Sequence, residues 1–315
     1  MSNYFTHLHL HTEFSLLDGA IPLSKVVGFA KEHEIPSIGI SDHGNIFGAV
    51  KFFQLAKKEG IKPILGMEAY ITEDASIKDN ENRYRHLLII VQNAQGYKNL
   101  CKLISFSYQE GFYFKPRIDY NILEKHHEGL IVTSACLGGH IPQLLMNNQE
   151  QQARERIDWF INLFGRDRFY LEVQPEYQEE QKVLNQKLYT LSQEFNLKTV
   201  VGCDCHYPAK EDREAHEVML SIQTRSKITD DDRFTFGECL AYMKTPSEAL
   251  EMFKGHEDAV YNTGIIADSC DFDFATGKLF FPKFEIPQEH TPETFFKQLC
   301  QQGLNTLIDH GRIAK

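Results

Sequence analysis

The chain is 315 residues long, with 42% hydrophobic and 24% charged residues, a composition typical of a soluble globular protein of one or two domains. Lys and Arg number 33 against 44 Asp and Glu, so the net charge of −11 argues against a surface that binds nucleic acid by charge alone. The sequence contains neither a run of about 18 apolar residues nor a signal peptide, and its seven scattered cysteines suit a reducing compartment, so we expect a cytoplasmic protein without a membrane-spanning helix.

Apolar runs typical of β-strands alternate with helical patterns over most of the chain. The predicted strands are residues 5–11, 37–41, 63–71, 86–92, 130–133, 169–174 and 198–203. The predicted helices between them are residues 22–33, 46–59, 97–109, 149–164, 179–195 and 210–224. Alternating strands and helices with short connections predict an α/β fold with a mostly parallel sheet. About seven strands favour a barrel over an open doubly wound sheet.

The pattern changes after residue 224. It indicates an acidic loop at residues 230–233 and two short helices at residues 245–253 and 257–269. An extended linker at residues 279–287 and a threonine-capped helix at residues 291–313 follow. We therefore expect one domain over residues 1–285. Residues 286–315 are expected to be a linker and the first helix of a following domain, which would make the chain a fragment of a longer protein.

Three histidines, His7, His9 and His11, occupy every second position near the start of the chain. On a β-strand such residues share one face, whereas on a helix they would diverge. A row of imidazoles with a carboxylate, Asp18, on the following turn is typical of a metal site. From this segment alone, a histidine-rich surface strand is the alternative.

Further polar residues fall at the ends of the predicted strands, namely His43, Glu68, His86, Cys136, Asp204 and His206. The carboxyl ends of parallel strands form one rim of an α/β fold, so most of these side chains should converge there. Each has a structural alternative, such as a helix cap, an ion pair or a buried thiol, but unrelated structural residues would not favour one rim. With His9, His11 and Asp18 they make nine candidates, which exceeds the need of one tetrahedral zinc and suggests a cluster of two or three ions.

Four stretches resemble a known family. The sequences HLHLHTEFSLLDG at 7–19 and SDHGN at 41–45 resemble the PHP (polymerase and histidinol phosphatase) family. The sequences GIKPILGMEAY at 60–70 and GFYFKPRID at 111–119 are similar to the PHP domains at the N-terminus of bacterial DNA polymerase III alpha subunits. The resemblance extends over roughly residues 5–285.

This resemblance implies a distorted seven-stranded (β/α) barrel with a trinuclear metal site at the C-terminal face of the strands. The family's nine ligand positions match, without a gap, His9, His11, Asp18, His43, Glu68, His86, Cys136, Asp204 and His206. These residues would act through bound metals in phosphodiester hydrolysis, which in a replicative polymerase means 3′-to-5′ exonuclease proofreading. Zinc suits the His and Cys ligands and manganese the carboxylates, with magnesium or iron as further candidates.

Three basic residues, Lys115, Arg117 and Arg85, are candidate phosphate contacts, and for each the alternative is a solvated loop charge. In the polymerase setting the expected partners are the 3′ end of a DNA primer strand, the polymerase domains of the same chain and other replisome subunits. His7 lies one strand repeat before His9 and shares its face, and we expect it to support the site or the fold rather than to bind metal.

Two other functions remain open from the sequence. The domain could be a structural platform that braces the polymerase or docks a separate exonuclease, since closed metal sites can be purely structural. It could instead be a stand-alone phosphatase of a small phosphomonoester. The polymerase reaction itself is not expected here, because no set of magnesium-binding palm carboxylates can be placed beyond the barrel.

Overall fold

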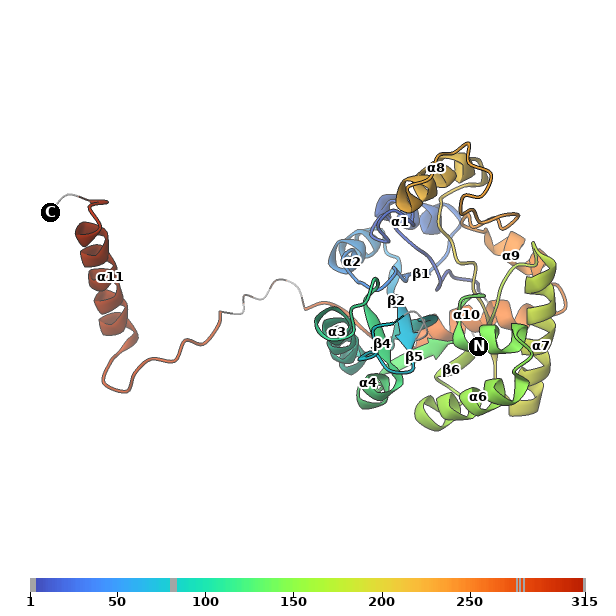
Figure 1. The fold of residues 1–315 in the computed structure, drawn as a ribbon, viewed down its shortest axis with the longest axis horizontal. Helices are drawn as coiled ribbons and strands as arrows, with labels where there is room; N and C mark the ends of the chain where they lie inside the picture. Colours follow the sequence, from blue (N-terminus) through green and yellow to red (C-terminus); the bar gives the residue numbers. More distant parts are fainter. Residues whose placement is uncertain (1–3, 80–83, 276, 278, 280, 314–315) are drawn as a thin grey trace. The chain divides into compact units, whose positions relative to one another are not determined.

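The computed structural model describes residues 4–79, 84–275, 277, 279 and 281–313. Clustering of contacts divides the chain into two units, Met1–Phe274 and Ala275–Lys315. The first unit holds the described strands and helices α1 to α10, and the second holds helix α11 (Figure 1). Among the described helices, none combines the length and the apolar character that a membrane span requires.

The strands are β1 (Ser37–Ile40), β2 (Lys62–Thr72), β3 (Arg85–Val91), β4 (Arg117–Asp119), β5 (Leu130–Thr133), β6 (Phe169–Val173) and β7 (Thr199–Val201). The helices are α1 (Leu23–Glu32), α2 (Ala49–Lys58), α3 (Ala94–Gln109), α4 (Tyr120–Lys125), α5 (His140–Met146), α6 (Glu150–Phe164), α7 (Glu179–Phe195), α8 (Arg213–Thr224), α9 (Pro246–Met252), α10 (Glu257–Ser269) and α11 (Pro292–Asp309), with a short 3-10 helix, η1 (Lys210–Asp212), before α8. Most agree with the predicted elements to within a few residues. The short β4, α4 and α5 lie where the sequence predicts no element.

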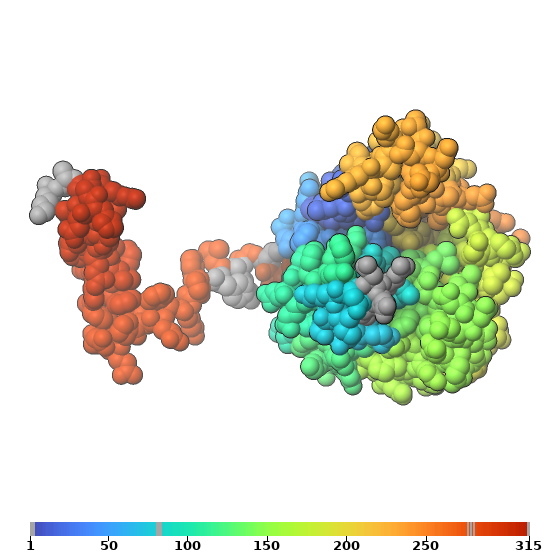
Figure 2. All heavy atoms as spheres, in the orientation of Figure 1, coloured from blue at the N-terminus to red at the C-terminus, as the bar shows by residue number. Residues whose placement is uncertain are grey.

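The seven strands form one sheet in the order β1-β2-β3-β5-β6-β7, and β4 pairs with the end of β2. Most neighbours are parallel, as predicted, but β3 is antiparallel to both β2 and β5. The first residues of β3 therefore lie at the same rim as the last residues of the parallel strands. This unit is hollowed between α8 with the loop after it (orange) and the green and cyan segments (Figure 2).

The segment 7–12 joins the two edges of this sheet. On one side, its backbone forms hydrogen bonds with β1 and with Ser41, which follows β1. Gly39 N donates to His7 O at 2.8 Å, and Ser41 N donates to Leu10 O at 2.8 Å. On the other side, His11 N donates to Cys205 O at 2.8 Å, just beyond β7. The segment carries only isolated bridges, so the strand predicted over 5–11 is irregular. Its bonds to both edges give the α/β sheet its predicted barrel-like form.

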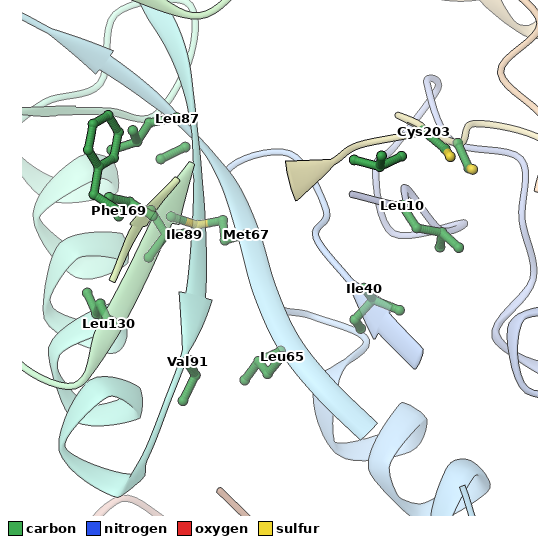
Figure 3. Close-up of a cluster of buried hydrophobic side chains, with 14 of the residues drawn as sticks. Leu10, Ile40, Leu65, Met67, Leu87, Ile89, Val91, Leu130, Phe169 and Cys203 are labelled. Carbon is green, nitrogen blue, oxygen red and sulfur yellow. The ribbon is translucent and has the colours of Figure 1, made fainter. Parts of the chain in front are cut away.

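Side-chain alternation along β2 and β3 separates two layers. One face contributes to the larger core against the helices, through Leu65, Met67, Leu87, Ile89 and Val91 (Figure 3). The opposite face contributes Ile64 and Leu88 to a smaller buried cluster. Glu68 and His86 occupy the same face as Ile64 and Leu88 at period two, so the alternation sends both polar side chains inward at the rim.

The second unit consists of an extended stretch and α11. Thr291 caps this helix, since its hydroxyl accepts from Thr294 N at 3.3 Å, and the helix has no buried residue among those described. Residue 280 of the predicted linker lies outside the described residues. The contact clustering divides the chain at Phe274, and the predicted domain boundary after residue 285 stays a prediction.

Candidate metal centre

The structure brings all nine candidate ligands to one rim of the sheet. The loop after β1 stays paired with β2 through a bridge between His43 and Glu68, which sets these two side chains next to each other. His86 arrives from the start of the antiparallel β3, and Asp204 follows β7. The backbone of Asp204 has φ +45°, a left-handed conformation that is costly for a residue with a β-carbon.

Glu68 is the hub of the cluster and is buried, with 1% of its surface exposed. Its Oε1 lies 2.9 Å from His86 Nδ1 and 3.3 Å from His9 Nε2. Its Oε2 lies 3.1 Å from His43 Nδ1 and 3.2 Å from His11 Nε2. One carboxylate therefore faces four imidazole nitrogens, an arrangement suited to bridging two cations.

Asp204 faces the same histidines from the opposite side. Its Oδ1 lies 3.3 Å from His9 Nε2 and 3.2 Å from His11 Nε2. The same oxygen is 3.5 Å from His206 Nδ1. Two carboxylates thus share the Nε2 atoms of His9 and His11.

Asp18 and Cys136 complete the cluster at its two ends. Asp18 Oδ2 lies 2.9 Å from His43 Nε2, and its Oδ1 lies 3.9 Å from His206 Nε2. Cys136 Sγ is 3.4 Å from His86 Nδ1. The donor atoms fall into three groups that could each hold an ion, namely His11 with His43 and His206; His9 with His11, Glu68 and Asp204; and Glu68 with His86 and Cys136.

Five buried atoms of this cluster have no hydrogen-bond partner, namely His9 Nε2, His11 Nε2, His43 Nδ1, Glu68 Oε2 and Asp204 Oδ1. Buried polar atoms are nearly always paired, because leaving one unpaired costs about 1–3 kcal/mol. Neighbouring atoms of this set lie 3.1–3.3 Å apart. Ligand atoms about 2.0 Å from one tetrahedral ion are separated by roughly the same distance, about 3.3 Å. The donor set therefore fits divalent metal ions.

The charges of the cluster also favour a bound cation. Burial raises the pKa of Glu68, but positive charge on His86 and His9 outweighs burial and holds that pKa well below its usual range. Burial, and then the charges of Glu68 and Asp204, raise the pKa of the Cys136 thiol well above its usual range. Ionised carboxylates here depend on protonated histidines or bound cations, and a Cys136 thiolate depends on a cation.

A buried carboxylate that the sequence analysis missed, Glu172, holds His9 in place. Its Oε1 lies 2.7 Å from His9 Nδ1 and accepts from Gln174 Nε2 at 3.0 Å, while Thr133 Oγ1 donates to its Oε2. A β-carbon at Gly202 would lie 1.9 Å from Glu172 Oε1, so glycine is needed there. An Nδ1–H donated to Glu172 leaves Nε2 of His9 with a lone pair for a metal. A glutamate in the apolar run 169–174 is the signal that could have revealed it.

A second buried carboxylate, Asp42, ties the N-terminal turn to β1. It accepts from Thr12 N at 2.7 Å and from Ser15 Oγ at 2.8 Å. Ser15 Oγ in turn lies 3.1 Å from His11 Nδ1 and accepts from His43 N at 3.1 Å. Asp42 therefore orients two candidate ligands through one serine.

His7 does not lie beside His9 and His11. Its Nε2 is 2.9 Å from Lys244 O and its Nδ1 is 3.5 Å from Cys205 Sγ, in a buried region next to the site. The prediction that His7 shares a strand face with His9 and His11 is therefore wrong, because the segment is irregular and side-chain alternation breaks within it. Its contacts agree with the structural role predicted for His7.

The three predicted phosphate contacts differ in their surroundings. Lys115 lines the cavity above the cluster, with its Nζ 5.3 Å from the centre of the Tyr70 ring. Arg117 is 1% exposed, and its guanidinium donates to Gly111 O, Ala75 O and Ile77 O, each at 3.0 Å. The predicted phosphate contact of Arg117 is therefore wrong, because its donors are used inside the protein. Arg85 is not among the described lining residues, and its role stays a prediction.

A cavity of about 600 Å³ opens above the cluster (Figure 2). Seven of the nine candidates line it, namely Asp18, His43, Glu68, His86, Cys136, Asp204 and His206. His9 and His11 lie beneath, with no exposed surface. The centre is thus open on one side, as catalytic metal sites are, rather than closed.

Comparison with known proteins gives both sequence and structural matches. The sequence profile of the PHP domain matches residues 7–176. The DNA polymerase III alpha subunit of Borreliella burgdorferi is 40% identical over 306 residues, covering 95% of this chain and 27% of that protein. The Aquifex aeolicus alpha subunit is 39% identical over 333 residues, covering 99% of this chain and 28% of that protein. The chain therefore spans about a quarter of the length of the curated relatives it matches.

A crystal structure of a candidate metal-dependent phosphoesterase from Bifidobacterium adolescentis aligns with a TM-score of 0.44 and 16% sequence identity. The alignment covers 79% of this chain and 95% of that one.

Proposed function

This chain belongs to the PHP domain family, in the form that DNA polymerase III alpha subunits carry, and we propose that its nine-residue cluster hydrolyses the 3′-terminal phosphodiester bonds of DNA. The reaction would be a metal-dependent 3′-to-5′ exonuclease step in proofreading. The observation that carries the proposal is the set of five buried ligand atoms that face one another without hydrogen-bond partners. The proposed ions are two or three divalent metals, zinc or manganese, with magnesium or iron as further candidates.

The candidate ligands form three groups of donor atoms that would each hold an ion, and Glu68 belongs to two of these groups. Bound cations would lower the pKa of an attacking water and offset charge that develops on the phosphoryl oxygens. Glu68 and Asp204 hold the histidine nitrogens toward the shared centre. Glu172 keeps the proton of His9 on Nδ1. Lys115, at the cavity wall, would orient the phosphate by its charge.

The setting of this reaction is also proposed. The substrate would be the 3′ end of a primer strand, delivered by polymerase domains of the same chain with other replisome subunits in the cytoplasm. The similarity to alpha subunits supports this setting. Nucleotidyl transfer by the intact protein would take place outside these residues.

A structural platform is the second candidate, and the complete burial of His9 and His11 favours it, because structural metal sites are closed. The cavity that opens on the other ligands argues for catalysis instead. Stoichiometric metal without any hydrolysis would support the platform.

The test is digestion of a 3′-labelled single strand by the purified chain with manganese, zinc or chelator. We expect stepwise loss of 3′ nucleotides that requires metal and disappears in Asp204→Asn. A small phosphomonoester serves as the competing substrate. Faster hydrolysis of that monoester than of the DNA end would contradict the exonuclease and indicate a phosphatase.

A further inference from the structure

The cavity above the cluster extends well beyond the candidate ligands and has aromatic walls. Its aromatic lining consists of Tyr70, Tyr84, Tyr177, Phe234 and Phe236. Tyr70 stacks on His43 with ring centres 5.5 Å apart, so this ring is already engaged with the cluster. Phe234, in contrast, is 53% exposed, and it lies in the loop between α8 and α9. The hydrolytic step as proposed makes no use of Phe234.

The loop that carries Phe234 is fixed next to the cluster. The ring of Phe236 meets His206 edge-on, with centres 4.8 Å apart, and Phe234 packs against Phe236 at 5.9 Å. The carbonyl of Phe236 accepts from Gln178 Nε2 at 3.3 Å, which ties the loop to the start of α7. The carbonyl of Gly237 accepts from Arg213 of α8. An exposed aromatic ring is therefore held at a set position above the candidate metals.

The remaining lining is almost neutral. Among the described lining residues, Lys115 is the only Lys or Arg. Four glutamines supply amide donors and acceptors instead, namely Gln174, Gln178, Gln181 and Gln223. Duplex DNA is held by many cationic contacts to its phosphates, whereas single strands are held largely by bases stacking on aromatic rings. A volume of about 600 Å³ is in the usual range of about 300–1,000 Å³ for one small ligand.

We infer that this cavity takes a single unpaired nucleotide, with its phosphate at the metal cluster and its base stacked on Phe234. The inference rests on the proposed function and specifies its substrate, a 3′-terminal nucleotide that has left the duplex. A paired terminus cannot enter, because its base remains stacked and hydrogen-bonded within the helix. Selection of mismatched or frayed ends follows from the shape of the cavity, without any reading of base identity.

Nucleotide binding can be measured separately from hydrolysis. The probe is 2-aminopurine deoxyriboside 5′-monophosphate, whose fluorescence is quenched when its base stacks, titrated into the manganese-loaded chain. Deoxyribose 5-phosphate is the competitor without a base. We expect quenching on binding and an affinity for the nucleotide about tenfold or more above that for the sugar phosphate, since one stacked base contributes about that factor.

The decisive variant is Phe234→Leu, which keeps an apolar side chain and removes the aromatic face. It should lose the quenching and most of the tenfold preference, while its affinity for deoxyribose 5-phosphate stays at the wild-type value. The matched control is Phe112→Leu, because Phe112 is 47% exposed and is not among the described lining residues. This control should bind both probes as the wild type does.

Equal affinity for the nucleotide and the sugar phosphate in the wild type would overturn the inference, as would an unchanged preference in Phe234→Leu. These outcomes are distinct from failure of the exonuclease. A chain that binds and quenches the nucleotide but cleaves no DNA would contradict the proposed function and leave the base site standing. A chain that cleaves paired and unpaired 3′ ends at equal rates would overturn the base site alone.

Discussion

Two buried clusters of polar groups in this protein, one around Glu68 and Asp204 and one around Arg117, differ in how their polar atoms are paired. At the rim, five ligand atoms around Glu68 and Asp204 are buried without a hydrogen-bond partner. Around Arg117, at the start of β4, the guanidinium is equally buried, yet it donates to the carbonyls of Gly111, Ala75 and Ile77.

The contrast separates a binding site from a structural one. The charged residues at the centre of both, Glu68, Asp204 and Arg117, are functional candidates from the sequence. A buried charge whose donors are paired is tolerated, and removing it leaves its partners unpaired at a cost to folding, whereas buried ligand atoms that face one another unpaired carry a cost that a bound ion can remove. We therefore predict that changes at the rim act on metal and activity, and that changes at Arg117 act on folding.

The largest effect is expected from Asp204→Asn. This change removes one of the two carboxylates that face His9 and His11, and hydrolysis should fall by about a thousandfold or more, or about 4 kcal/mol in the activation barrier. His43→Ala should act in the same way. The measurement is the rate of 3′ nucleotide release together with metal content after gel filtration. Full activity in a well-folded double variant would rule out the catalytic assignment.

Arg117→Met should have the next largest effect, on folding alone. The change leaves the buried carbonyls of Gly111 and Ala75, and the partly buried carbonyl of Ile77, without this donor, and the free energy of unfolding should fall by about 2–4 kcal/mol. Denaturant titration measures this loss, and metal content per folded chain should not change. Arg154→Met is the control, because the ion pair of Arg154 with Glu194 lies on the surface and should contribute little. Loss of metal in a folded Arg117→Met chain would erase the distinction between the clusters.

Glu172→Gln should weaken metal binding by about 10–100-fold without unfolding the chain. The variant keeps the shape of Glu172 but removes the negative charge that holds the Nδ1 proton of His9. Metal affinity is measured by competition with a chelating dye, and Glu110→Gln, an exposed change at the end of α3, is the control. Unchanged affinity would show that His9 does not depend on Glu172 for its orientation.

The smallest effect concerns pH and a half-buried histidine outside both clusters, His140. Burial, and then the positive charges of Arg156 and Arg85, lower the pKa of His140 to about 4 from its usual 6.5. The folded chain thus keeps His140 neutral at pH values where the unfolded chain protonates it. Stability from this source is complete above about pH 6.5 and is lost as the pH falls toward 4.

The variant His140→Gln should therefore lose less stability than the wild type between pH 7 and pH 5. Denaturant unfolding with chelator present measures this difference without a contribution from metal release. A larger acid loss in the variant would contradict the assigned pKa direction.

The sequence was informative where chemistry and periodicity agree. Strand-end placement predicted a shared rim, and all nine candidates meet there. His86 shows a limit of that argument, because β3 runs antiparallel and only its first residues reach the rim. The direction of a strand depends on its neighbours, and a short apolar run does not encode it.

Other features depend on packing that the sequence does not display. Arg117 looks like a phosphate contact in an aromatic and basic stretch, and only the fold shows that its donors end on carbonyls. Glu172 lies in an otherwise apolar strand, and its role depends on the close approach that Gly202 permits. His7 fits the histidine spacing, but the irregular backbone of segment 7–12 turns it away from His9.

The central claim is that the unpaired atoms at the rim face bound cations. Anomalous X-ray scattering from crystals of the chain grown with manganese tests it most directly. We predict anomalous peaks between Glu68, Asp204 and the surrounding histidines, lost in Asp204→Asn crystals grown in the same way. A rim without anomalous density, in a chain that still hydrolyses DNA 3′ ends, would contradict the account.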